Sequence, residues 1–393
     1  MNRRDLLRLL AATSVCAIGG KLYAAPTETK LLVVFLRGAY DAASLLVPVE
    51  SDFYYESRPN IAIAPPGKGQ RSALPLDDGW GLHPALSKSL LPLYERKQLV
   101  FVPFAGSQNT SRSHFETQMI MELGEAKDRE AINTGFMNRL AQALSSRKER
   151  PVSFTSNLPT IFRGDLQVPN VALSDSQNRY SNRQTQALRE MYAASDLGNE
   201  VEEGLRLMGD AGQGLRKEMR EANGNAISTS ALDRQIGRVA QLMREEFSVG
   251  FLDIGGWDTH VAQGGATGVL ASRFSQLGNG LRHFAEQMGP HWDNTVVIVL
   301  SEFGRTFHEN GSKGTDHGRG TNYWVLGGKV NGGRLAGEQT QLSDKTLVDK
   351  RDYPVLNEYR SVLGGMFQKM YSLNADQLAS IFPGSRPVDL AIL

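Results

Sequence analysis

The sequence predicts an α/β fold of three layers, α/β/α, in which helices cover both faces of a largely parallel central sheet. Three observations support this prediction. Continuous apolar runs, typical of strands buried on both faces, recur along the chain, the first at residues 31–36. Amphipathic stretches alternate with these runs, which favours a doubly wound arrangement. Carboxylates and imidazoles follow several of the runs, at the strand ends where such folds build their active sites.

The N-terminal segment, residues 1–25, has the features of a twin-arginine signal peptide. Arg3 and Arg4 precede a short, mildly apolar run at residues 9–20, and small residues at 24 and 25 offer a cleavage site. The run is too short to span a bilayer. We therefore predict export by the twin-arginine translocase to a periplasmic or secreted location, with residues 26–393 forming a single domain. The alternative is an ordinary secretory signal that carries two arginines by chance.

Composition limits the classes of partner. The single cysteine, Cys16, lies inside the predicted signal, so the mature chain has no disulfide and depends on a large core. The formal net charge is +1. Removing the signal, with its four basic residues and one acidic residue, leaves a charge of about −2. This balance gives no electrostatic reason to expect a nucleic-acid partner, and no later segment is apolar enough for stable membrane insertion.

In the first half of the chain, short predicted strands lie between helical stretches. Strands are predicted at residues 31–36 and 98–104, with short ones near 160–162 and 171–173. Helices are predicted at residues 84–96, from a cap at 111 or 113 to about 123, and at 133–146. Ser113 with Glu116 has the pattern of a capping box. Residues 182–222 are polar and rich in helix formers, which predicts a helical insertion or cap.

The second half alternates more regularly between the two kinds of element. Strands are predicted at residues 249–254, 295–300 and 323–326, and helices at 233–247, 269–288 and 359–371. The helix at 269–288 is strongly amphipathic, because Leu270, Phe274, Leu277 and Leu281 recur at three- and four-residue spacing. Such alternation is typical of parallel strands joined by helices.

Six side chains near the predicted strand ends are candidate ligands of a divalent metal. They are Asp41, Asp258, His260, Glu302, Asp316 and His317. Carboxylate oxygen and imidazole nitrogen together suit Zn, Mn or a similar ion such as Ca. A pair of such ions can hold the attacking and leaving oxygens of a phosphoryl or sulfuryl group.

Each candidate ligand also has a purely structural interpretation. Asp41 follows a Gly-rich segment and could be a turn or cap residue. Asp258 and His260 could belong to a hydrogen-bonded loop. Glu302 comes directly after a predicted buried strand and could form an ion pair with Arg305.

The segment at residues 111–114 is the candidate for nucleophilic catalysis. Ser113, with Ser111 as the alternative, would present a hydroxyl at a helix N-terminus, where backbone N–H groups favour an anion. Arg112 and His114 complete this group, and the structural alternative for Ser113 is a helix cap alone. The sequence has no Gly-x-Ser-x-Gly elbow, no Walker A loop and no His-Glu-x-x-His, so other common catalytic patterns are excluded.

Seven short motifs are distributed over almost the whole of residues 26–393. They lie at residues 32–38 together with Asp41, and at 54–63, 81–84, 111–116, 256–260, 301–306 and 316–318. Combined, they resemble the DUF1501 family, whose members are exported bacterial proteins placed in the alkaline phosphatase/sulfatase-like superfamily. The resemblance implies an alkaline phosphatase-like core, with Asp41 as a metal ligand and Ser113 or Ser111 as the nucleophile. It also implies that the ligands on later loops are Asp258, His260, Glu302, Asp316 and His317.

Two places depart from the pattern of that family. Its members usually carry Gly-Gly-x-Asp-Gly after the first strand, whereas Ala39 and Ala42 stand at two of those positions here. Glu302 is followed by Phe303, where hydrolases of the superfamily commonly have Asp followed by His. Because Phe303 cannot bind a metal, these departures imply one ion or none.

The function expected from the sequence is metal-dependent hydrolysis of phosphate or sulfate esters outside the cytoplasm. The substrate would be an anionic small molecule or a glycan ester, and the cofactor a divalent metal. A second interpretation is a non-catalytic periplasmic protein of the same fold that binds an anionic glycan or a protein partner. A third is a metal-free structural protein.

Overall fold

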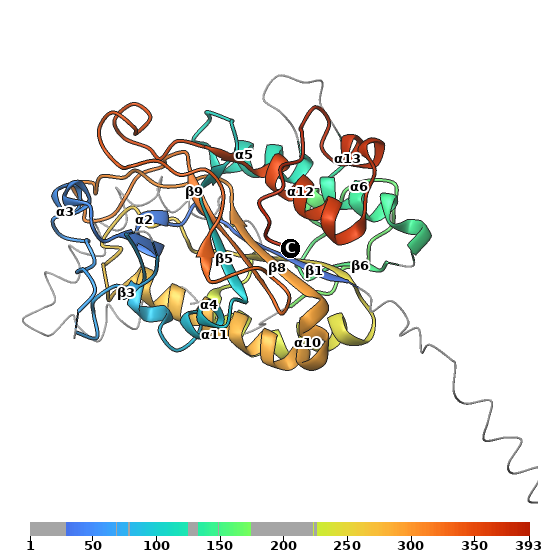
Figure 1. Cartoon of the computed structure of the whole chain (residues 1–393). Helices are drawn as coiled ribbons and strands as arrows, with labels where there is room; N and C mark the ends of the chain where they lie inside the picture. Colours follow the sequence, from blue (N-terminus) through green and yellow to red (C-terminus); the bar gives the residue numbers. More distant parts are fainter. Residues whose placement is uncertain are drawn as a thin grey trace, which may run out of the picture.

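Strand β1 (Lys30–Leu36) runs through the middle of an eight-stranded sheet (Figure 1). Its two neighbours, β7 (Val249–Ile254) and β8 (Thr295–Ser301), are both parallel to it. The order across the sheet is β10-β5-β9-β8-β1-β7-β6, and β11 pairs with β5. Among the described strands of this large sheet, β9 (Thr321–Gly327) alone is antiparallel to its neighbours, so the sheet is largely parallel, as predicted.

This computed structural model describes residues 29–173, 223 and 226–393, apart from residues 68, 78, 125–132 and 148. The predicted signal peptide at residues 1–25 and the predicted insertion at 182–222 lie outside the described residues. None of the described helices combines the length and the apolar character needed to cross a bilayer.

The remaining strands complete two sheets. The large sheet also contains β5 (Leu99–Gly106), β6 (Pro151–Ser153), β10 (Arg334–Leu335) and β11 (Asn357–Glu358). A small antiparallel sheet contains β2 (Leu46–Pro48), β4 (Trp80–Leu82) and β3 (Leu74–Pro75).

The α-helices are α2 (Ala42–Leu45), α3 (Asp52–Ser57), α4 (Leu91–Glu95), α5 (His114–Leu123), α6 (Phe136–Ala143), α10 (Thr229–Glu245), α11 (Val269–Met288), α12 (Tyr359–Tyr371) and α13 (Ala375–Ile381). Short 3₁₀-helices are η1 (Pro84–Leu86), η2 (Ser145–Arg147), η3 (Thr160–Phe162) and η4 (Gly289–Asn294).

Three layers follow from the alternation of side chains along β1. Leu32, Val34 and Leu36 pack into one core with residues of α10 and α11, whereas Leu31, Val33 and Phe35 pack into a second core with residues of α6, α12 and α13. The two groups of helices lie on opposite sides of the sheet (Figure 1). The apolar run is continuous because both faces of the strand are buried, and the predicted α/β/α architecture is confirmed.

Three local predictions were wrong. The helix predicted at 84–96 is split into η1 and α4, because a helix running through Pro92 would lose one backbone hydrogen bond; Pro92 instead lies in the first turn of α4. Residues 160–162 form a 3₁₀ turn, in which Phe162 N donates to Pro159 O. Residues 171–173 lie outside any strand. Helix α13 was not predicted.

Candidate metal centre

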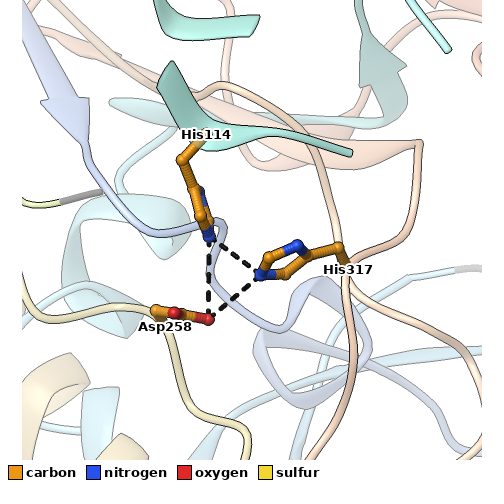
Figure 2. Close-up of side chains that lie close together, drawn as sticks. All are labelled: His114, Asp258 and His317. Carbon is orange, nitrogen blue, oxygen red and sulfur yellow. Dashed lines mark hydrogen bonds and ion pairs between the residues drawn. The ribbon is translucent and has the colours of Figure 1, made fainter. Parts of the chain in front are cut away.

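Three side chains from distant parts of the chain meet at the carboxyl edge of the sheet. We call His114, Asp258 and His317 the metal triad (Figure 2). His114 Nε2 lies 2.9 Å from His317 Nε2, and Asp258 Oδ1 lies 3.7 and 3.4 Å from these two nitrogens. All three residues are buried. His114 was predicted as a catalytic residue; the structure places it with the predicted ligands.

Two further residues contact the triad directly. His260 Nε2 lies 2.8 Å from Asp258 Oδ1 and 3.0 Å from His317 Nε2. Arg305 Nη1 donates to the same Asp258 oxygen at 2.6 Å, so Arg305 pairs with Asp258 and not with Glu302. The solvent-accessible side of the cluster is that of His260, whose side chain is 16% exposed, against 3% for His114.

Hydrogen bonds fix the tautomers of all three histidines. His114 Nδ1 donates to Glu302 Oε1 at 2.7 Å, His317 Nδ1 to the Arg112 carbonyl oxygen at 2.8 Å, and His260 Nδ1 to Asp316 Oδ1 at 3.2 Å. In its neutral form each ring therefore carries its lone pair on Nε2, the atom that faces the cluster. Metal-binding histidines are oriented in the same way by carboxylates and carbonyl groups.

The residues of the triad fit a divalent metal ion. Lone pairs that face each other at 2.9 Å repel unless a proton or a metal ion lies between them. Asp258 Oδ2 is buried, and within the described residues nothing donates a hydrogen bond to it. The three separations bracket about 3.3 Å, the spacing of tetrahedral ligands whose bonds to zinc are about 2.0–2.1 Å long.

The shifted pKa values of the triad residues also indicate a site that favours a cation. Burial lowers the pKa of His114, but the carboxylates of Asp258, 3.7 Å away, and of Glu302, a hydrogen-bond partner at 2.7 Å, outweigh burial and raise it to about 9. Burial raises the pKa of Asp258, but the surrounding imidazoles and the guanidinium of Arg305 bring it well below its ordinary value. The pKa of His317 is lowered, mainly by burial. The apo cluster therefore holds a proton on His114, where a metal ion would compete with it.

Close backbone packing brings the loops together. Gly38, in the turn after β1, has φ +114°, and a Cβ at this position would lie 2.6 Å from the Asp258 backbone nitrogen. After β8, residues 303–306 pair with residues 316–319 through hydrogen bonds such as Gly304 N to Arg319 O, 2.8 Å. A Cβ on Gly304 would lie 1.8 Å from Gly320 O, so this pairing requires glycine. The pairing carries His317 back towards α5.

Glu302 supports His114 through a direct hydrogen bond. Its Oε1 accepts hydrogen bonds from Gly38 N, His114 Nδ1 and Gln118 Nε2 at 2.7–2.8 Å, and its Oε2 accepts one from Ser301 Oγ. These donors use the acceptor positions that a metal would need. Asp316 acts similarly on His260, although its side chain is half exposed.

Asp41 lies in a separate buried ion pair. Arg58 donates to both of its oxygens, at 2.5 and 3.0 Å, and Ser44 Oγ and Gln263 Nε2 each donate at 2.7 Å. Burial raises the pKa of Asp41, but Arg58 outweighs burial, so the pKa is lowered. Gln263 also accepts a hydrogen bond from Thr315, which connects this pair to the loop of the triad. The structure therefore does not bring Asp41 together with the other predicted ligands.

The predicted nucleophiles lie beside the triad without contacting it. Ser113 is the N-cap of α5 and accepts a hydrogen bond from Glu116 N, whereas Ser111 Oγ donates to Glu116 Oε2 at 2.7 Å. Among the described residues, neither hydroxyl forms a hydrogen bond to the triad. Arg112 contributes its carbonyl oxygen to His317, and its guanidinium pairs with Asp352 at 2.7 Å.

Sequence reasoning missed several supporting residues. Gln118 could have been found, since it lies four residues after His114 and therefore on the same face of α5. Arg58 and Gln263 carried no local signal, because their partners are far away in the sequence.

Several solved structures are similar to this chain, with low sequence identity. Similar solved structures include an alkaline phosphatase superfamily protein from Vibrio parahaemolyticus, with 13% identity, coverage of 85% of this chain and 71% of that chain, and a TM-score of 0.39. The lipoteichoic acid synthase LtaP from Listeria monocytogenes shares 8% identity over 98% of this chain and 81% of that chain, with a TM-score of 0.40. A 2-O GAG sulfatase shares 9% identity over 91% and 75% of the two chains, with a TM-score of 0.39.

No curated protein matches the chain significantly in sequence. A family model described as a protein of unknown function, DUF1501, matches residues 28–382. This match spans most of the sequence and includes every residue of the metal triad. The chain therefore belongs to the DUF1501 family.

Proposed function

We propose that this protein is an exported, metal-dependent hydrolase of phosphate or sulfate esters. The main support for this proposal is that His114 Nε2, His317 Nε2 and Asp258 Oδ1 lie close together. The Nδ1 atom on the other side of each imidazole ring is hydrogen-bonded to an acceptor, which fixes the orientation of the ring. Such a ligand set, with three protein ligands, is typical of catalytic metal sites, which leave a further position for substrate.

The ligand types favour a transition metal. Imidazole suits Zn and similar ions, whereas Ca takes oxygen ligands almost exclusively. We therefore propose Zn or Mn, held by His114, Asp258 and His317, with His260 as the candidate for a fourth ligand. A divalent ion at this place supplies Lewis acidity toward an ester oxygen.

Guanidinium groups beside the triad suit an anionic ester. Arg112 and Arg351 both contact His317. The Arg112 carbonyl oxygen accepts a hydrogen bond from His317 Nδ1, and Arg351 Nη2 donates a 2.9 Å hydrogen bond to His317 O. Arg319 follows two residues later and is partly exposed. Their charges attract a phosphate or sulfate group, and Arg112 can bind it with two parallel hydrogen bonds once Asp352 releases it.

Ser113 remains the candidate nucleophile, with Ser111 as the alternative. Ser113 directly precedes His114 and stands at the N-terminus of a ten-residue helix, where backbone N–H groups stabilise an alkoxide. To attack the substrate, the Ser113 hydroxyl must give up the hydrogen bond that it accepts from Glu116 N. The Ser113→Ala variant should abolish turnover, and the lost cap should cost about 1 kcal/mol of stability.

The test combines metal binding with turnover. Purified protein, stripped of metal, should bind zinc in calorimetry and then hydrolyse p-nitrophenyl phosphate or p-nitrocatechol sulfate. Asp258→Asn and His317→Ala should each lose zinc binding and activity. The matched control is His291→Ala, because His291 is exposed and lies before β8, at the opposite edge of the sheet. Failure of the wild type to bind zinc or manganese would refute the metal site.

The hydroxyls of Ser111 and Ser113 are both hydrogen-bonded to Glu116 and not to the triad, which favours a second, non-catalytic function. On this reading the protein binds an anionic glycan or protein partner without chemistry. Zinc binding without turnover of any ester, together with saturable binding of a sulfated or phosphorylated ligand, would select this function over hydrolysis.

A further inference from the structure

A groove of about 440 Å³ lies between α5 and residues 155–160, outside the metal triad. Its volume falls in the range of small-molecule sites. Its walls come from three parts of the chain: the exposed side of α5, the segment 155–160 with Arg163, and the strand ends that carry Arg37 and Asp253.

The rim of this groove gathers exposed apolar side chains. Phe115 is 71% exposed, Leu158 49% and Met119 39%. They are three of the six large hydrophobic side chains that are exposed in the described part of the chain. Phe115 and Met119 are four residues apart and thus share one face of α5. Single exposed apolar residues are ordinary, but a group around one groove indicates a binding site.

Asp253 lines the floor of the groove, and one of its carboxylate oxygens has no donor. Asp253 is 5% exposed, and its Oδ2 accepts from Arg37 Nε at 2.6 Å. Its Oδ1 is buried and accepts no hydrogen bond within the described residues. By contrast, both oxygens of the neighbouring Glu122 are satisfied, by Arg37 at 2.8 Å and Ile161 N at 2.9 Å. An unsatisfied buried acceptor costs about 1–3 kcal/mol, and a ligand donor would offset this cost once a rotation of the Asp253 side chain turns Oδ1 into the groove.

We propose that this groove binds a sugar ring of an oligosaccharide. A sugar has an apolar C–H face, which packs on an exposed aromatic ring such as Phe115, and hydroxyl donors around its edge. Those donors match Asp253 Oδ1 on the floor and the exposed amide of Asn157 on the rim. A lipid chain would cover the apolar rim but leave Asp253 Oδ1 unsatisfied.

The groove and the metal triad share one hydrogen-bonded wall. Gln118 lines the groove and accepts from Arg37 Nη1 at 2.7 Å, and it donates to Glu302 Oε1 at 2.8 Å. Glu302 in turn orients His114. If the proposed ester hydrolysis holds, the sugar is the alcohol part of the substrate; sugar binding itself does not require that hydrolysis.

The experiment measures binding of the full-length mature protein to an array of sulfated and unsulfated oligosaccharides, including chondroitin and xylan fragments. The strongest binder is then titrated calorimetrically. Phe115→Ala and Asn157→Ala should each weaken binding about tenfold or more, a change of about 1.4 kcal/mol. The matched control, Val388→Ala, removes an apolar side chain that is 45% exposed and lies outside the groove, and it should bind as the wild type does.

Asp253→Asn tests the floor separately. It keeps the shape but puts an amide N–H donor in place of one acceptor, so binding should weaken while zinc affinity stays unchanged; circular dichroism checks that the variant folds. No binding to any oligosaccharide, or equal binding by the wild type and both rim variants, overturns the proposal. Capture of phosphatidylglycerol vesicles or apolar peptides that is lost in Phe115→Ala also overturns it. Sugar binding without ester turnover would refute the proposed hydrolase activity but leave the sugar-binding groove supported. Ester turnover without sugar binding would refute the sugar-binding groove but leave the hydrolase activity supported.

Discussion

Replacing Asp41 with Asn should destabilise the fold and spare the metal centre. Asp41 and Arg58 are 1% and 0% exposed, and Arg58 donates to both carboxylate oxygens. The amide keeps one acceptor oxygen, which can still face Ser44, Gln263 and one Arg58 nitrogen. Its NH₂ group would then meet the other Arg58 nitrogen, donor against donor, and the buried guanidinium would lose its counter-charge.

The magnitude follows from this geometry. Removing one partner of a fully buried ion pair costs about 3–5 kcal/mol, because the remaining charge stays buried without compensation. Since a domain is stable by about 5–15 kcal/mol in total, the variant should fold but unfold at much lower urea concentration. Zinc affinity should change less than about threefold, because Asp41 makes no hydrogen bond to the triad and is linked to it through intervening side chains such as Gln263, Thr315 and Arg305.

The assay is urea unfolding followed by tryptophan fluorescence, together with zinc titration by calorimetry. Asp258→Asn is the matched comparison, because it removes the same charge from the triad itself and should abolish zinc binding. Wild-type stability of Asp41→Asn, together with zinc binding as weak as that of Asp258→Asn, would refute this prediction. Asp41 would then be a metal ligand, as the family resemblance implied.

Three other predictions follow from particular residues. Glu302→Gln keeps the shape of the side chain that supports His114 but removes its charge, so zinc affinity should fall about 10- to 100-fold. The affinity is measured by competition with a chromophoric chelator. An unchanged affinity would show that Glu302 does not orient His114. Burial lowers the pKa of His83 to about 4, so this residue stays neutral in the folded protein while the unfolded chain protonates it below about pH 6.5. Its contribution of about 3 kcal/mol should therefore be lost as the pH falls from 6.5 to 4, and a His83→Gln variant, compared by urea unfolding at several pH values, should lack this component. Replacing both Arg3 and Arg4 with Lys should leave precursor in the cytoplasm, and normal export on cell fractionation would exclude the twin-arginine route.

The elements of the central sheet could be predicted because their determinants are local. An apolar run at residues 31–36 can be buried on both sides only within a sheet covered on both faces, and the structure shows this burial for every residue of β1. The helix at 269–288 follows from apolar spacing alone, and its predicted bounds match α11. A cap at 111 or 113 was likewise predicted, and the structure places it at Ser113, so α5 begins at His114.

The antiparallel direction of β9 could not be predicted from its own residues. Its apolar run is buried in the same way as those of β1 and β8. Strand direction depends on how the preceding loop returns, and the segment between β8 and β9 turns back through the pairing of residues 303–306 with 316–319. That pairing needs close contact between Gly304 and Gly320, which a reading of apolar periodicity does not detect.

The sequence by itself determined which loops carry the chemistry, because carboxylates and imidazoles that follow parallel strands must gather at one edge of the sheet. Only the tertiary structure decided the role of each residue. Asp41 and Asp258 both follow a buried strand and a glycine, yet one faces Arg58 and the other faces three imidazoles. These partners are brought together by contacts such as that between Gly38 and Glu302, which are 264 residues apart. The role of an ionisable side chain depends on the charges and lone pairs around it, and those come from segments that no local pattern links.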